Sequence, residues 1–124
     1  MKTLTSYLFF LGLIFNLQNA YAQKPITLEE VQKYLNQPET VLIEATIAEV
    51  KTADKITYIN LGDKHPNQKL AIIIFDTVLF KLKPLLFQQW ENRRIKITGQ
   101  ITDYKGNQQP QIILENSSQI EFLE

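Results

Sequence analysis

The side chains most suited to chemistry are few in this chain of 124 residues. The single histidine, His65, lies two residues after Asp63 in a segment rich in turn-forming residues. One imidazole and one carboxylate do not make a zinc site, which takes three or four protein ligands. The chain contains no cysteine, and this excludes disulfides, thiolate catalysis and cysteine-ligated zinc. We therefore expect no metal site and no cofactor.

Acid–base and nucleophilic sites find equally little support. No serine can be combined with His65 and an aspartate in a positional order that indicates a catalytic triad. Asp76, Asp103 and the glutamates show no paired spacing typical of glycoside hydrolysis. Arg93 and Arg94 suit phosphate contacts, although solvating the start of a strand is the simpler interpretation. The sequence does not group an Asp, a Glu and two separated arginines around one loop, as some exported nucleases do. We therefore expect no catalytic residues, and we expect that the protein is not an enzyme.

Charge and hydropathy limit the class of protein. Lys and Arg total 13, Asp and Glu total 13, and 44% of the residues are hydrophobic. A chain without net charge has no overall field that would attract a polyanion. Its share of apolar residues supports a folded core and argues against disorder. The length fits one compact domain, not two.

The first 22 residues have the pattern of a secretory signal peptide. Lys2 supplies the charged n-region, residues 7–15 form the apolar h-region, and Ala20-Tyr21-Ala22 is a small-x-small cleavage site. The apolar run has about half of the roughly 20 residues that cross a bilayer, so an uncleaved membrane anchor is the weaker alternative. We expect cleavage after Ala22, export to the periplasm or the medium, and no stable membrane insertion after processing.

Residues 23–39 are predicted to form an N-terminal helical segment. Thr27 and Glu30 have the spacing of a capping box, in which the hydroxyl accepts from the Glu30 amide and the Glu30 side chain reaches back. Pro38 ends the segment, because a proline disfavours helix in the residue before it. Glu29 and Glu30 are therefore interpreted as partners of the helix start and not as catalytic acids.

From residue 40 the pattern changes to strands, and residues 40–124 are predicted to form one mainly β domain. Alternating or continuous apolar residues between turn formers indicate five strands: 40–50, 55–61, 70–75, 94–104 and 111–115. Residues 119–123 either continue the last strand after a bend or pair separately. Residues 76–90 are helix-like but interrupted by Pro84, which predicts a short helix between the third and fourth strands.

Gly99 lies inside an otherwise regular strand, where glycine costs about 0.5–1 kcal/mol relative to alanine. A strand tolerates this cost where it bends sharply or bulges, as at the corners of small closed barrels. Five strands with a helix between the third and the fourth match a five-stranded Greek-key barrel. Closing the barrel would also remove open sheet edges.

Several stretches also resemble a known family. The segments Thr57–Gln68, Ile72–Phe75, Ile95–Gly99 and Tyr104–Leu114 are similar to small exported bacterial OB-fold proteins of the nucleic-acid-binding class. The most specific parts are the tyrosine-to-glycine second strand and the hairpin with the pattern Y-K-G-x-x-Q-P-Q-I. The resemblance covers residues 40–123. It implies an OB barrel with a binding surface, and it does not imply a reaction.

The resemblance places that surface on the outer face of the second and third strands, between two loops. Because side chains alternate between the faces of a strand, Ile59 and Leu61 facing inward leave Tyr58 and Asn60 outside. The same alternation on the third strand leaves Phe75 outside. The flanking loops add two pairs of residues, and the candidate ligand-binding residues are Tyr58, Asn60, Phe75, Lys51, Lys55, Tyr104 and Lys105.

Two functions stay open. Aromatic rings and lysines on one face would form a stacking platform for single-stranded nucleic acid or a similar extended polymer. Alternatively, Tyr58 and Phe75 pack against the N-terminal helix or the segment around Trp90, and a register shift of one residue would exchange the two faces. We predict a non-catalytic OB-fold binding module, with a periplasmic protein-interaction or small-ligand module as the alternative. Neutral charge and export favour the alternative, whereas the resemblance favours the polymer.

Overall fold

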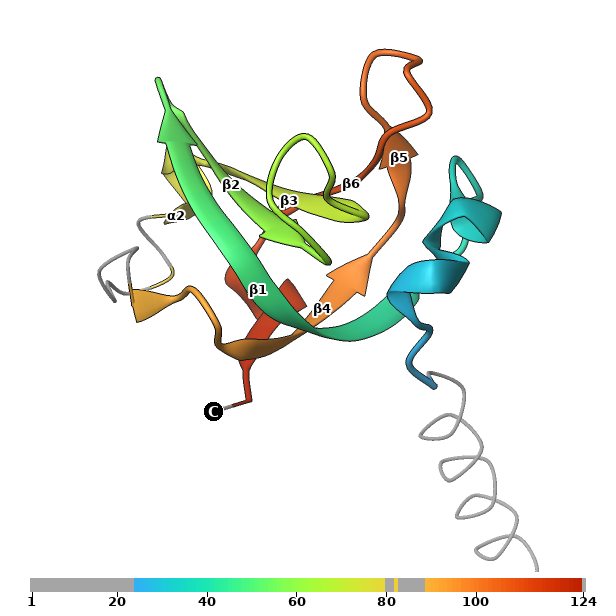
Figure 1. Ribbon diagram of the computed structural model, residues 1–124, viewed down its shortest axis with the longest axis horizontal. Helices are drawn as coiled ribbons and strands as arrows, with labels where there is room; N and C mark the ends of the chain where they lie inside the picture. Colours follow the sequence, from blue (N-terminus) through green and yellow to red (C-terminus); the bar gives the residue numbers. More distant parts are fainter. Residues whose placement is uncertain (1–23, 80–81, 83–88, 124) are drawn as a thin grey trace, which may run out of the picture.

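The computed structural model describes residues 24–79, 82 and 89–123 (Figure 1). The predicted signal peptide and most of the segment from 80 to 88, with Pro84, lie outside the described residues. The described part is mainly β, with one short α-helix between β3 and β4 as expected. Its elements are η1 (Leu28–Tyr34), β1 (Val41–Ala53), β2 (Ile56–Leu61), β3 (Leu70–Phe75), α2 (Asp76–Leu79), β4 (Arg94–Gly99), β5 (Thr102–Asp103), β6 (Pro110–Ile113), η4 (Ser117–Gln119) and β7 (Ile120–Phe122).

The strands form one sheet with the order β5-β6-β3-β2-β1-β4-β7. The only parallel pair among these strands is β3–β6, and the other neighbours are antiparallel. The long strand β1 pairs with β4 through its first half and with β2 through its second half. A register irregularity between Ile47 and Glu49 separates the two halves. Because a bulge bends a strand and increases its twist, β1 can follow both parts of the curved sheet (Figure 1).

The predicted five-stranded closed barrel is wrong in strand number and in closure. The described sheet has seven strands and is open, with β5 and β7 at its two ends. The predicted strand 94–104 is divided because Gln100 and Ile101 leave the ladder between β4 and β5. Of the two alternatives for residues 119–123, separate pairing is confirmed, because β7 pairs with β4. It is separated from β6 by η4, where the Asn116 side chain accepts a hydrogen bond from the Ser118 amide at 3.1 Å. These local breaks let two segments of chain contribute four short strands.

The predicted end of the first strand at residue 50 is also wrong, because β1 continues to Ala53. Ala53 pairs with Ile56 across a tight turn at Asp54 and Lys55. Asp54 adopts a φ of 59°, a left-handed conformation that aspartate tolerates better than most residues. Lys51 therefore lies on a strand and not in a flanking loop.

The N-terminal helical segment is shorter than predicted. Among the described residues 24–39, only Leu28–Tyr34 is helical, and it is a 3₁₀ helix. Its start has the predicted capping box. The Glu30 carboxylate accepts from the Thr27 backbone N–H at 3.0 Å and from the Thr27 hydroxyl at 3.1 Å. These hydrogen bonds, the backbone one first, lower the pKa of Glu30.

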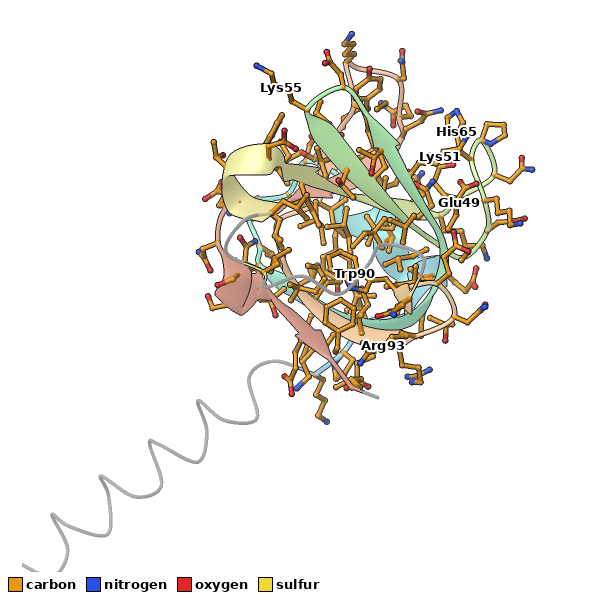
Figure 2. All side chains as sticks on the ribbon, turned by 90° about the vertical axis from the view of Figure 1, so that its left-hand side faces the viewer. Glu49, Lys51, Lys55, His65, Trp90 and Arg93 are labelled. Carbon is orange, nitrogen blue, oxygen red and sulfur yellow. The ribbon has the colours of Figure 1, made fainter. Side chains whose placement is uncertain are left out.

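The core lies inside the curve of the sheet. On β2 and β3 the inward positions Ile59, Leu61, Leu70, Ile72 and Ile74 are fully buried, as the alternation of faces predicted. Trp90 is also buried (Figure 2). Its ring centroid lies 5.1 Å from that of Phe122. Burying large apolar side chains is the main source of stability for a domain of this size. The inward register therefore fixes which side chains of β2 and β3 remain on the outer face.

Gly99 is required by close packing. A Cβ atom at this position would lie 2.7 Å from Cγ2 of Ile112 and 3.3 Å from Nε2 of Gln119. The register irregularity expected at a glycine is found in β1 instead, although the chain does leave the ladder directly after Gly99. The absence of a side chain at residue 99 therefore lets β4 approach β6.

Candidate binding groove on the outer face of β2 and β3

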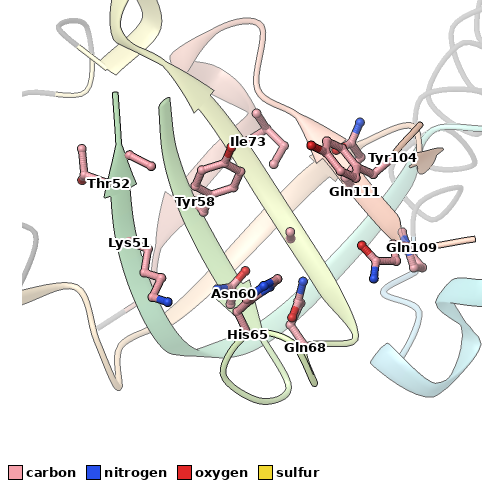
Figure 3. A pocket seen from close by; sticks show the side chains of 13 residues that line it. Lys51, Thr52, Tyr58, Asn60, His65, Gln68, Ile73, Tyr104, Gln109 and Gln111 are labelled. Carbon is pink, nitrogen blue, oxygen red and sulfur yellow. The ribbon is translucent and has the colours of Figure 1, made fainter. Parts of the chain in front are cut away.

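A groove of about 470 Å³ lies on the outer face of β2 and β3. The end of β1 forms one wall, and the β5–β6 loop forms the opposite wall. The loop of residues 62–69 borders the groove at a third side (Figure 3). We call this cavity the tyrosine groove, because Tyr58 and Tyr104 both line it. The two rings come from elements far apart in the sequence and lie on opposite sides of Ile73 (Figure 3).

Tyr58 is held by the register of three strands. It lies opposite Lys51 on β1 and opposite Ile73 on β3. Its ring is half-buried, whereas Ile73 on the groove floor is only 7% exposed. The side chain therefore lies on the outer face, as predicted, and one part of its ring is open to the groove. Packing of Tyr58 into the core beside Trp90 is excluded by this register.

Tyr104 is presented by the loop between β5 and β6. Its backbone N–H donates to the Gln109 carbonyl at 3.1 Å, and its carbonyl accepts from Asn107 N–H at 2.9 Å. Asp103 Oδ1 accepts from the Gln109 amide at 3.2 Å and closes the base of the loop. The ring is 40% exposed. These hydrogen bonds order the backbone of the loop from which the exposed ring projects.

Glu49 joins strand β2, on the floor of the groove, to the 62–69 loop. Its Oε1 atom accepts from Nδ2 of Asn60 at 2.9 Å and from the backbone N–H of His65 at 3.0 Å. The hydrogen bond from His65 lowers the pKa of Glu49, with smaller contributions from Asn60 and from nearby lysines, whereas desolvation acts in the opposite direction. Asn60 is itself only 2% exposed. An ionised Glu49 therefore fixes both the Asn60 side chain and the start of the 62–69 loop.

The predicted site residues do not all meet. Those that line the tyrosine groove are Lys51, Tyr58, Asn60 and Tyr104. The other three, Phe75, Lys55 and Lys105, are not among its lining residues.

These three residues lie at different positions outside the lining of the groove. Phe75 is 42% exposed at the far end of β3, opposite Ile56. Lys55 lies at the tip of the β1–β2 hairpin, away from Lys51 (Figure 2). The Lys105 ammonium lies 5.3 Å from the centroid of the Tyr104 ring. The predicted cluster of three lysines is thereby reduced to one lysine in the groove.

The groove also contains residues that the sequence interpretation missed. Carboxamides of Gln68, Gln109 and Gln111 line it, together with His65. Gln111 lies beside Ala71 because β3 and β6 are parallel neighbours. The alternation of faces around buried Ile112 was a usable signal for Gln111. The loop residues carried no such signal.

The described residues contain no group of three or more His, Cys, Asp or Glu side chains that could hold a metal ion. Within the same part of the chain, no helix has the length and apolar character needed to cross a membrane. The ionisable side chains that line the groove are Lys51, His65 and the two tyrosines. Its chemistry is that of a polar and aromatic binding surface.

Comparison with known proteins gives similarity in structure and not in sequence. No protein-family model and no curated protein sequence matches the chain. An OBody bound to hen egg-white lysozyme superimposes with a TM-score of 0.58 at 13% identity, covering 82% of this chain and 90% of the other. The Stn1-ten1 complex of S. pombe gives 0.58 at 13% identity, with 84% and 80% covered.

A third similar structure is asparaginyl-tRNA synthetase from Pyrococcus horikoshii. It has a TM-score of 0.55 at 8% identity, and the match covers 82% of this chain but 23% of the synthetase. Similarity at these identities establishes a fold and nothing about ligands. The chain has an OB-like fold, built here as an open sheet of seven strands.

Proposed function

We propose that this protein is a non-catalytic binding module that holds an extended polymer in the tyrosine groove. One observation carries the proposal: Tyr58 and Tyr104, from separate elements, line the same open cavity on the outer face of β2 and β3. This face and its flanking loops are where OB folds bind oligonucleotides and oligosaccharides. Two rings along one groove offer successive units of a chain a surface to stack on.

The positions of the rings support an extended ligand. Tyr58 is anchored by strand pairing, and Tyr104 is anchored by the hydrogen bonds that close its loop. Because the backbone that carries each ring is already ordered, little backbone freedom is lost when a ligand binds, and more of the contact energy becomes affinity. The buried floor residue Ile73 lies between them. A chain crossing the groove would therefore contact one ring, an apolar floor and then the other ring.

A protein partner is the second candidate, and it is favoured by a different surface. Phe75 and Ile113 are 42% and 38% exposed, on the neighbouring strands β3 and β6. Among the similar structures, the OBody is bound to a protein, lysozyme. Exposed apolar side chains of this kind are typical of protein-binding surfaces.

We also propose that the protein acts after export, on the basis of the signal-peptide pattern in its first 22 residues.

A matched pair of variants tests the groove. Tyr104 and Phe75 are almost equally exposed, at 40% and 42%, but only Tyr104 lines the groove. Binding is measured by fluorescence anisotropy on labelled oligothymidylate and on labelled neutral oligosaccharides, in parallel. We expect Tyr104→Ala to weaken binding of whichever polymer binds by roughly ten- to hundredfold, since stacking on one ring is worth about 1–3 kcal/mol. Phe75→Ala should leave the affinity unchanged.

The same two variants also show which results would contradict the proposal. Equal losses in Tyr104→Ala and Phe75→Ala would show that binding does not depend on the groove. No binding of any polymer by the unaltered protein would refute polymer binding altogether. Thermal unfolding of both variants is the control, because an exposed ring contributes little to the core.

A further inference from the structure

A second cavity adjoins the tyrosine groove. It has a volume of about 350 Å³ and lies between η1, the 62–69 loop and the β5–β6 loop. We call it the η1 cavity. It shares the lining residues Gln68, Gln109 and Pro110 with the tyrosine groove. The two cavities are therefore neighbours across these three residues.

Carboxamides are the commonest type of polar side chain in the lining of the two cavities. Six side chains of this type line one cavity or both: Gln32, Asn60, Gln68, Gln108, Gln109 and Gln111. Each carboxamide provides two donors and one acceptor oxygen, a combination that matches hydroxyl and acetamido groups, which also donate and accept.

Gln68 lies at the junction of the two cavities and has unused hydrogen-bonding capacity. Its Oε1 atom is buried and has no hydrogen-bond partner among the described residues. A buried acceptor without a donor is unfavourable. A ligand hydroxyl or N–H at the junction would supply the missing donor after a small rotation of this half-buried side chain.

The charge of the lining disfavours a polyanion. The lysines that line the two cavities are Lys51 and Lys69, and Lys69 is paired with Glu29 at the edge of the η1 cavity. Lys51 has no ion pair among the described residues. Lys105 adds a second positive charge beside the groove, 5.3 Å from the centroid of the Tyr104 ring. Two such lysines contrast with the continuous positively charged grooves that follow a phosphate backbone. An uncharged chain does not need such compensation.

We infer that the ligand is an uncharged glycan, which runs from the tyrosine groove past Gln68 into the η1 cavity. This inference rests on the proposed function and names its ligand class. The tyrosine rings contact the apolar faces of the sugars, and the carboxamides bind their hydroxyl and acetamido groups. N-Acetylglucosamine oligomers carry both groups and are the probe.

The first experiment compares ligand classes. Isothermal titration calorimetry measures the affinity of the full chain for the N-acetylglucosamine hexamer and for a thymidylate hexamer, at low and at high salt. We expect the sugar hexamer to bind with an affinity that changes less than about twofold between roughly 50 and 200 mM salt, because no counterions are released. The affinity for the thymidylate hexamer should be at least about tenfold lower at the higher salt than at the lower salt, since several phosphate contacts would be needed to hold it.

The second experiment tests the path through the η1 cavity. Gln32 lines only the η1 cavity, where its Nε2 donates to the Gln108 carbonyl at 3.2 Å. Gln32→Ala should weaken hexamer binding by roughly three- to tenfold, the effect of losing one or two hydrogen bonds, and leave binding of the disaccharide unchanged. Gln37→Ala is the matched control, because Gln37 is exposed beyond the end of η1 and outside both cavities.

The outcomes separate this inference from the proposed function. Salt-dependent binding of thymidylate that is lost in Tyr104→Ala would overturn the glycan and leave the polymer-binding groove standing. Sugar binding that does not increase from disaccharide to hexamer, or that is equally strong in Gln32→Ala, would overturn the path through the η1 cavity. If neither polymer binds, both the inference and the proposed function are refuted.

Discussion

Replacing Gly99 with alanine tests how closely β4 approaches β6. The new Cβ would lie 2.7 Å from Cγ2 of Ile112, about 0.8 Å or more inside the ordinary carbon–carbon contact of roughly 3.5–4.0 Å. Ile112 is fully buried and cannot swing into solvent. Overpacking of this kind costs about 1–3 kcal/mol. At an open strand position the same substitution would instead stabilise the protein by about 0.5–1 kcal/mol, so the sign of the effect is informative.

The free energy of unfolding is measured by urea titration for the unaltered protein, Gly99→Ala, Ile112→Ala and the double variant. Ile112→Ala alone should cost about 2–5 kcal/mol because it leaves a cavity. If the contact between residues 99 and 112 causes the loss in Gly99→Ala, the double variant should be at least about 1 kcal/mol more stable than the sum of the single effects predicts. Gly99→Val should be more destabilising than Gly99→Ala, because the larger side chain overlaps more with Ile112.

Gly106→Ala provides the control. Gly106 has a φ of +73° and no atom within 4 Å of its ideal Cβ position. Its replacement should cost about 1–2 kcal/mol through the backbone alone, and this cost should add to that of Ile112→Ala. A stabilised Gly99→Ala protein, or additivity of Gly99→Ala with Ile112→Ala, would refute the close-packing explanation.

Three further predictions concern the groove and the leader. The pKa of Glu49 lies below its ordinary value of 4.5 in the folded protein, so the contribution of Glu49 to stability is complete at higher pH and is lost as pH falls through the folded pKa. The free energy of unfolding should therefore fall less steeply below about pH 4.5 in Glu49→Gln than in the unaltered protein. An equal fall in both proteins, measured by urea titration across that range, would contradict this. Tyr58→Ala should lower the unfolding free energy by about 1 kcal/mol, the scale of one cross-strand pair, whereas a loss of about 3–5 kcal/mol in thermal melts would mean that the ring is core. The intact mass of exported protein should be that of a chain beginning at Gln23, and a full-length chain in the membrane fraction would disprove cleavage after Ala22.

Features that depend on neighbours along the chain could be predicted from the sequence. The alternation on β2 and β3 assigned Ile59, Leu61 and Ile72 to the core, and all three are fully buried. The spacing of Thr27 and Glu30 likewise predicted the start of η1. Both signals are local: a strand has a period of two residues, and a capping box spans four. Local periodicity and capping can therefore be interpreted without knowing which strands pair.

Which side chains share the groove depends on how the strands pack together, and the sequence did not predict it. Gln111 reaches it because β6 pairs in parallel with β3, and Phe75 misses it because β3 extends beyond the groove's end. The number of predicted strands had indicated a closed barrel. The sheet of the structure is open, with breaks in the strands after Gly99 and at η4. Pairing across long sequence separations depends on register and side-chain contact between strands, and no single segment encodes either. The elements were therefore local properties of the sequence, whereas the composition of the binding surface was a property of the packed sheet.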